Sequence, residues 1–240
     1  MPLPASSNCV YLSGSFASGM AHAASDFDIF VITDEPFLPE NPTGVGHASV
    51  DPQAYPIVIR QLPEGRCDIE YWQALQVSRL IEKFAPGNST LGFTIDDVDF
   101  LYRLSIARPL SGEDWLREQQ ETLARSEFAS MVAQRAFGTA DSLFEDALGM
   151  LAVGDQHSAV LAAHEGFGRA IDGLLAIHRQ FSPRRKWRAQ KLMRAGPELI
   201  SLDEYWAIET MAEFASTAPD RWVRDVIERA RDLMMEVELS

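Results

Sequence analysis

Asp26 and Asp28 are separated by one residue at the start of an apolar run, and Gly14 and Ser15 come shortly before them in the chain. Side chains two residues apart on a strand face the same side, so the two carboxylates should lie together. Adjacent carboxylates repel each other unless a cation lies between them, and Mg²⁺ prefers carboxylates combined with substrate phosphates. The pattern indicates a site for a metal-bound nucleoside triphosphate; the alternative is a solvated aspartate pair at the start of a strand.

Two predicted strands position these residues. Residues 10–12 are apolar and β-prone, and residues 27–33 form a second such run. Between them, Gly14 allows a sharp turn close to a ligand, and the backbone N–H groups after Ser15 can point at phosphate oxygens. The alanine-rich residues 16–24 predict a short helix.

A third acidic segment follows in residues 66–72, which alternate polar and apolar side chains as a half-buried strand does. Asp68 and Glu70 share one face of this predicted strand. Residues 57–59 predict its hairpin partner, with a turn at residues 63–65. The alternative is an edge strand with one solvated polar face.

The Gly-Ser turn, short helix and Asp-x-Asp strand resemble the DNA polymerase β-type nucleotidyltransferase superfamily. The likeness is greatest to small bacterial aminoglycoside and lincosamide nucleotidyltransferases and to minimal nucleotidyltransferases of toxin–antitoxin systems. It implies an α+β fold, in which a small mixed β-sheet catalytic domain precedes an all-α helical bundle. The specific motifs lie within about the first hundred residues.

The resemblance also implies an active site with three carboxylates. Asp26, Asp28 and Asp68 would hold two Mg²⁺ ions, and ATP or another nucleoside triphosphate would be the co-substrate. Glu70 would be the general base or would position the acceptor. The opposite assignment of Asp68 and Glu70 stays open.

Five residues are the predicted nucleotide ligands: Gly14, Ser15, Ser25, Lys186 and Lys191. The two lysines belong to the one dense basic cluster of an otherwise acidic chain. Cationic side chains can hold the outer phosphates and stabilise departing pyrophosphate. Related antibiotic nucleotidyltransferases use basic residues of the helical domain in this way. The alternative is a solvated basic face.

Near residue 111 the sequence changes from short apolar strands and loops to helical periodicity. This change predicts a catalytic domain at 1–110 and a helical domain at 111–240 that binds the acceptor or a partner. Thr94 is a predicted N-cap for a helix at residues 95–107. The second domain predicts helices near residues 113–137, 139–153, 155–180, 184–195, 201–216 and 219–238.

The net charge is −14, whereas proteins that bind nucleic-acid polymers need basic surfaces. This charge disfavours a nucleic-acid acceptor and suits a cationic small molecule, such as an aminoglycoside-like antibiotic. We therefore expect transfer of AMP from ATP to a small-molecule hydroxyl. The alternative is an antitoxin-like enzyme that binds and modifies a partner protein.

The remaining composition indicates a cytoplasmic protein. No apolar run is long enough to span a membrane, and the first residues do not have the pattern of a secretory signal. The two cysteines, Cys9 and Cys67, fall in or beside predicted strands and suit buried free thiols better than a disulfide. We expect a monomer or homodimer that does not bind a membrane.

Overall fold

The computed structural model describes residues 4, 6–88, 92–181, 184–196 and 200–238. The chain divides into two compact units, Met1–Phe128 and Ala129–Ser240. The division lies later than the predicted boundary after residue 110, because helix α4 (Glu113–Arg125) contacts two strands and two helices of the first unit. The α+β architecture of a mixed sheet followed by helices is confirmed.

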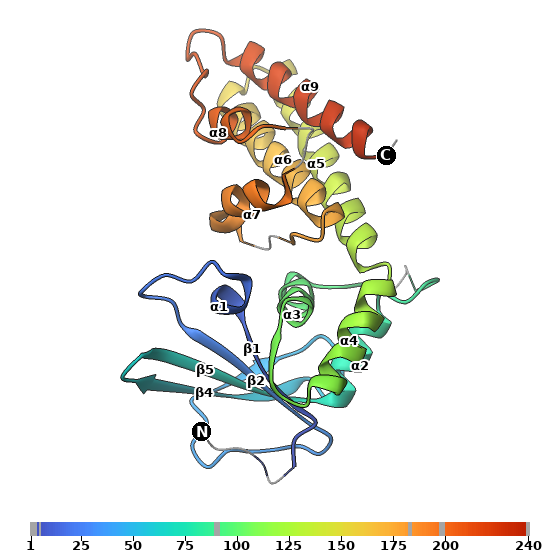
Figure 1. Cartoon of the computed structure of the whole chain (residues 1–240). Helices are drawn as coiled ribbons and strands as arrows, with labels where there is room; N and C mark the ends of the chain where they lie inside the picture. The colour runs from blue at the N-terminus through green and yellow to red at the C-terminus, as the bar shows by residue number, and fades with distance from the viewer. Residues whose placement is uncertain (1–3, 5, 89–91, 182–183, 197–199, 239–240) are drawn as a thin grey trace. The chain divides into compact units, whose positions relative to one another are not determined.

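The first unit is built on a six-stranded mixed sheet (Figure 1). Its strands, in chain order, are β1 (Cys9–Ser13), β2 (Phe27–Thr33), β3 (Gly44–His47), β4 (Ala54–Leu62), β5 (Gly65–Gln73) and β6 (Arg108–Ser111). Their order across the sheet is β3-β4-β5-β2-β1-β6, and β2 and β5 run parallel while the other neighbours run antiparallel. The parallel pair brings two distant segments of the chain together at the centre of the sheet.

The predicted hairpin is confirmed, because β4 and β5 pair antiparallel and their register closes with Leu62 opposite Gly65. Two strands were not predicted. Strand β3 lies inside the Pro- and Gly-rich connection after β2, and β6 contains Pro109 at the edge of the sheet. An edge position tolerates proline because one side of the strand needs no ladder hydrogen bonds.

The two faces of the sheet have different cores. One face holds an apolar cluster that includes Val31 and Ile69, with Phe37 packed beside Tyr71 at a ring-centroid distance of 5.2 Å. The other face is covered by α3 (Ile95–Ser105), whose Phe100 lies 4.0 Å from the Trp72 ring and 5.9 Å from that of Phe30. Helix α3 therefore covers the face that also carries Asp28 and Asp68.

Helix α1 (Gly14–Ser18) begins earlier and ends sooner than the helix predicted at residues 16–24. It ends at Gly19, which has the left-handed conformation that favours glycine as a helix stop. Helix α2 (Ala74–Glu82) follows β5 directly through a capping box at Gln73. Thr94 caps α3 as predicted, since its side chain accepts a hydrogen bond from the Asp97 backbone N–H.

The described part of the second unit is all-α. Its elements are α5 (Phe128–Ala152), α6 (Gln156–Ile177), the short 3₁₀ turn η1 (Arg185–Trp187), α7 (Arg188–Ala195), α8 (Leu202–Glu209) and α9 (Pro219–Glu238). The helix break predicted at Gly138 is wrong, because α5 runs through that residue and the preceding break lies at Ser126. None of the helices in the described ranges is both long and apolar enough to cross a membrane.

Close packing of α6 depends on glycine. A Cβ atom at Gly166 would lie 2.4 Å from the Phe144 ring of α5, and one at Gly173 would lie 2.2 Å from Phe137. The absent side chains leave room for two large rings, so α5 and α6 approach closely. Helix α9 packs along the same helix, α6, in the bundle (Figure 1).

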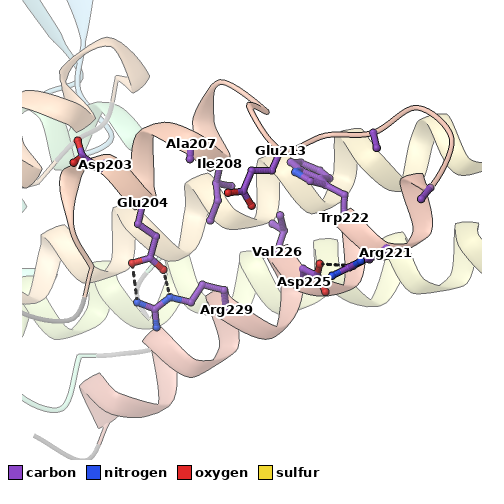
Figure 2. A pocket seen from close by; sticks show the side chains of 12 residues that line it. Asp203, Glu204, Ala207, Ile208, Glu213, Arg221, Trp222, Asp225, Val226 and Arg229 are labelled. Atoms are coloured by element: carbon purple, nitrogen blue, oxygen red, sulfur yellow. Dashed lines mark hydrogen bonds and ion pairs between the residues drawn. The ribbon is translucent and has the colours of Figure 1, made fainter.

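A pocket of about 660 Å³ lies between α8 and α9 in the second unit (Figure 2). Its arginines are paired: Arg229 donates to Glu204, and Arg221 lies 3.5 Å from Asp225. Carboxylates outnumber arginines in its lining, which also contains the nearly buried Trp222. The pocket lining contains none of the predicted site residues.

Candidate active site

Register pairing of the two central strands brings the predicted carboxylates together. Asp28 on β2 is opposite Asp68 on β5, and neighbouring strands lie about 4.8 Å apart. Asp26 directly precedes β2 and is two residues from Asp28, so strand alternation places it on the same side. The three aspartates therefore gather near the beginning of two parallel strands.

The turn after β1 lies directly against one of these carboxylates. Ser13, the last residue of β1, pairs with Asp28, and Gly14 follows with a φ angle of +64°. A Cβ atom on residue 14 would lie 2.0 Å from Asp28 Oδ2. Both the conformation and the space demand glycine, so the turn brings bare backbone beside the aspartates. Ser15 follows in the first turn of α1.

Arg66 holds two of the carboxylates. Its Nε and Nη2 donate to the two oxygens of Asp68 at 2.7 and 2.8 Å, and its Nε lies 3.9 Å from Asp26 Oδ2. The hydrogen bonds and charge of Asp68, with the charges of Asp26 and Asp28, raise the pKa of Arg66. One guanidinium thus spans two carboxylates from different strands.

Arg103 of α3 holds the third carboxylate. Its Nη1 donates to Asp28 Oδ1 at 2.7 Å and its Nε to Asp99 Oδ2 at 2.9 Å. The Ser13 hydroxyl donates to the Arg103 carbonyl oxygen at 2.6 Å, which connects α3 to the end of β1. The contacts of Arg103 therefore link α3 to strands β1 and β2 of the sheet.

Glu70 lies two residues beyond Asp68, on the same face of β5. It accepts a hydrogen bond from Trp72 Nε1 at 2.9 Å. Burial raises the pKa of Glu70 to about 7, although the Trp72 bond and the charge of Arg103 lower it. Glu70 lies farther along β5 than Asp68, which separates it from the aspartates near the beginning of the two strands.

The donor set suits a hard divalent cation. Asp26, Asp28 and Asp68 offer carboxylate oxygens, which Mg²⁺ prefers. The guanidinium of Arg66 already places positive charge between Asp26 and Asp68. All three carboxylates are paired with arginines, and no three Asp, Glu, His or Cys side chains in the described ranges converge on one point. The three aspartates suit a cation by the chemistry of their oxygen atoms, but a cation can bind them only after they exchange their arginine partners.

The other predicted nucleotide ligands have different surroundings. The Ser25 hydroxyl accepts a hydrogen bond from the His22 backbone N–H at 2.9 Å, within a turn before Asp26. In the helical unit, Lys186 is exposed and lies 4.9 Å from the centre of the Trp187 ring. Lys191 is buried and donates to the Phe181 carbonyl oxygen. Contact between either lysine and a triphosphate stays a prediction.

Sequence reasoning did not assign a role to Arg66 or Arg103. Arg66 could have been found, because it is two residues from Asp68 on one strand and so shares its face. Arg103 is four residues after Asp99 in the helix predicted at residues 95–107, and this i,i+4 pair was overlooked. The contact between Arg103 and Asp28 joins residues far apart in the chain and has no local sequence signal.

The Gly-Ser turn and its carboxylate strands agree with a family model. Residues 7–76 match the model described as "Nucleotidyltransferase domain". Residues 7–76 form a nucleotidyltransferase domain. Transfer of a nucleotidyl group is the activity that this nucleotidyltransferase domain supports. The match spans β1 to the start of α2 and includes Gly14, Asp26, Asp28, Asp68 and Glu70.

A solved structure shares the fold over most of the chain. The crystal structure of a nucleotidyltransferase-like protein from Exiguobacterium sibiricum 255-15 superposes with a TM-score of 0.50 and 11% sequence identity. The alignment covers 97% of this chain and 70% of that one. No curated protein has a significant sequence match to this chain. The fold of the nucleotidyltransferase domain with its helical unit thus occurs in a protein of very different sequence.

Proposed function

We propose that the protein transfers a nucleoside monophosphate, AMP from ATP, to a hydroxyl group of a small molecule. The observation that carries the proposal is the register pairing of Asp28 with Asp68, on the same face as the backbone turn at Gly14. Nucleotidyl transfer needs anionic side chains for a cation and bare backbone for phosphates, and these three residues supply both.

The carboxylates of Asp26, Asp28 and Asp68 would hold Mg²⁺. Bound there, the metal would lower the pKa of the acceptor hydroxyl and neutralise phosphate charge. The acceptor oxygen forms a bond to the α-phosphorus, the bond from that phosphorus to the bridging β-oxygen breaks, and pyrophosphate leaves. The turn at Gly14 and Ser15 would orient phosphate oxygens through backbone N–H groups, so catalysis comes mainly from positioning and charge.

Glu70 is assigned to the acceptor side of the site. Its place on the same face as Asp68, two residues farther along β5, leaves it distinct from the residues proposed to bind metal. There it would take the proton of the acceptor hydroxyl or hold the acceptor in line with the phosphorus. The two roles differ in effect: a lost base lowers kcat, whereas a lost positioning group raises the acceptor KM as well.

The proposed acceptor is small and cationic, as an aminoglycoside is. A net charge of −14 repels a nucleic-acid polymer and attracts an amine-bearing molecule. We place the enzyme in a reducing compartment such as the cytoplasm, because Cys9 and Cys67 are buried free thiols. Monomer and homodimer are both consistent with this chemistry.

The test is incubation of the purified full chain with ATP, Mg²⁺ and a panel of aminoglycosides, lincosamides and cell metabolites, followed by mass spectrometry. We expect one acceptor to gain one AMP unit while pyrophosphate appears in equal amount. The Asp28→Asn variant is the matched control and should give neither product. Equal product from this variant would reject the proposed site.

A partner protein as the acceptor is the competing outcome. Intact-mass spectrometry of any protein that co-purifies in stoichiometric amount would detect an added AMP unit on that partner. A labelled partner without small-molecule turnover would replace the small-molecule proposal, while leaving the roles of Asp28 and Asp68 unchanged.

A further inference from the structure

Arg66 contacts two of the candidate metal ligands directly. It lies two residues before Asp68 on the same strand, so both side chains project from the same face. Its guanidinium takes both carboxylate oxygens of Asp68, at 2.7 and 2.8 Å, and its Nε is 3.9 Å from Asp26. A single positive group therefore spans two of the three proposed metal ligands.

Arg103 provides an informative contrast. Its side chain is 20% exposed and is held by Asp28 together with Asp99, a residue outside the proposed metal set. The Arg66 side chain is 46% exposed, and its hydrogen bonds and ion pairs within the described ranges go to Asp68 and Asp26. Arg103 thus keeps a partner that is not a candidate metal ligand, whereas both of these partners of Arg66 are candidate metal ligands.

A divalent cation and the Arg66 guanidinium need the same oxygen atoms. In a two-bond arginine–carboxylate pair, each carboxylate oxygen accepts a charge-assisted N–H bond, so neither faces the metal freely. Metal binding to Asp68 must break this pair. Because the Arg66 side chain is nearly half exposed, its head group can be released into water with little loss of buried contacts.

We propose that the Arg66 guanidinium competes with the divalent cation for the carboxylate oxygens of Asp68 and Asp26. It neutralises Asp68 and Asp26 while the metal is absent, and it must swing away before these carboxylates can bind metal. This inference rests on the proposed function, because it concerns the same three aspartates. Its consequence is that Arg66 lowers the affinity of the nucleotide-free protein for divalent cations.

The size of the effect follows from the exposure of the pair. An exposed arginine–carboxylate pair contributes only a modest free energy, so its removal should raise cation affinity about fivefold. The metal-free variant should also be less stable, since three carboxylates lose a neutralising charge. Added Mg²⁺ should therefore raise the melting temperature of the variant more than that of the wild type.

The experiment is a titration of the full chain with Mn²⁺ alone, with free Mn²⁺ measured by electron paramagnetic resonance and no nucleotide present. Four proteins are compared: wild type, Arg66→Gln, Arg60→Gln and Asp68→Asn. Arg60 is the matched control, because it is exposed on β4 opposite Cys67, which places it on the other face of the sheet. Circular dichroism checks that each variant folds.

Tighter Mn²⁺ binding by Arg66→Gln, with Arg60→Gln near the wild type, supports the inference. Equal or weaker binding by Arg66→Gln, while Asp68→Asn binds less, overturns it and leaves the proposed metal site intact. Equal binding by Asp68→Asn and the wild type rejects the metal site itself, and the inference with it. A parallel gain in Arg60→Gln also overturns the inference, because the effect would then reflect net charge.

Discussion

Gly14 and Asp28 are so close that a Cβ atom on residue 14 would lie 2.0 Å from Asp28 Oδ2. The contact joins the turn after β1 to the carboxylate at the start of β2. Because Asp28 also pairs in register with Asp68, this one approach determines how near backbone N–H groups come to the proposed metal ligands. The active-site geometry therefore depends on a residue that has no side chain.

Gly14→Ala should damage both stability and catalysis. The new Cβ atom meets a carboxylate oxygen, and a φ of +64° is strained for alanine, so we expect a loss of about 1–3 kcal/mol in the free energy of unfolding. Urea denaturation measures that loss, and turnover should fall at least about tenfold as Asp28 is displaced. Gly44→Ala is the control, since nothing lies within 4 Å of its added Cβ. Wild-type stability and turnover in Gly14→Ala would contradict the assignment.

Asp28→Asn should lower turnover by about 10²–10³ or more, since removal of one preorganised electrostatic contact has effects of that size. The fold should persist, because Arg103 keeps its ion pair with Asp99. Steady-state kinetics and circular dichroism measure these two effects. Asp114→Asn removes the same charge from an exposed position on α4 and should leave turnover unchanged. Near-full activity of Asp28→Asn would exclude Asp28 from catalysis.

Cys9 should be unreactive toward thiol reagents at pH 8 in the native protein. The residue is fully buried, and burial raises the pKa of its thiol to about 12, which leaves about one thiolate in 10⁴ at that pH. Cys67 is also buried, and burial raises the pKa of its thiol, so it should react slowly too. Labelling followed by mass spectrometry tests this, with protein in concentrated urea as the reactive control. Rapid labelling of native protein would show that this core opens readily.

The raised pKa of Cys9 also predicts an alkaline loss of stability. The unfolded thiol ionises near pH 8.5, whereas the folded one stays protonated up to about pH 12. Its contribution to folding is therefore complete below pH 8.5 and decreases as the pH rises toward 12. Urea midpoints at pH 8 and pH 10 should differ more in the wild type than in Cys9→Ala. An equal difference in both proteins would show that ionisation of Cys9 does not cause the alkaline loss of stability.

The helical unit depends on the pair between Asp172 of α6 and Arg188 of α7. Arg188 is 8% exposed and donates to both Asp172 oxygens, at 2.7 and 2.8 Å. Gly168 makes room for it, because a Cβ atom there would lie 2.5 Å from Arg188 Nη1. Arg188→Met leaves the largely buried Asp172 with only the more distant Arg169, 3.7 Å away, as a charge partner. The loss in the free energy of unfolding, measured by urea denaturation, should be as much as about 3–5 kcal/mol.

This cost should depend on pH. Burial raises the pKa of Asp172 even with Arg188 beside it, and loss of the arginine raises it further. A carboxyl with a raised folded pKa favours folding at low pH and loses that contribution as the pH rises through its folded value. The destabilisation of Arg188→Met should therefore be smaller at pH 5 than at pH 7. The double variant Asp172→Leu, Arg188→Met should recover much of the loss, and a cost that grows on acidification would contradict the argument.

The central site was partly predictable because its signals are local. Period-two alternation placed Asp26 with Asp28 and Asp68 with Glu70, and glycine at residue 14 indicated a tight turn before any contact was known. The β4–β5 hairpin was likewise encoded by two short strands and a turn. Edge strand β6 was missed, because it is only four residues long and contains Pro109, which is unusual in strands.

Local sequence patterns were enough to predict the strand faces, the turn glycine and the change from sheet to helices, because each depends on neighbouring residues. The three-dimensional structure was needed to show that Asp28 lies opposite Asp68, because parallel pairing joins segments about forty residues apart and local propensity does not specify such register. It also decided which arginines hold these aspartates, and that Lys191 is buried. Those outcomes depend on the packing of side chains from different elements.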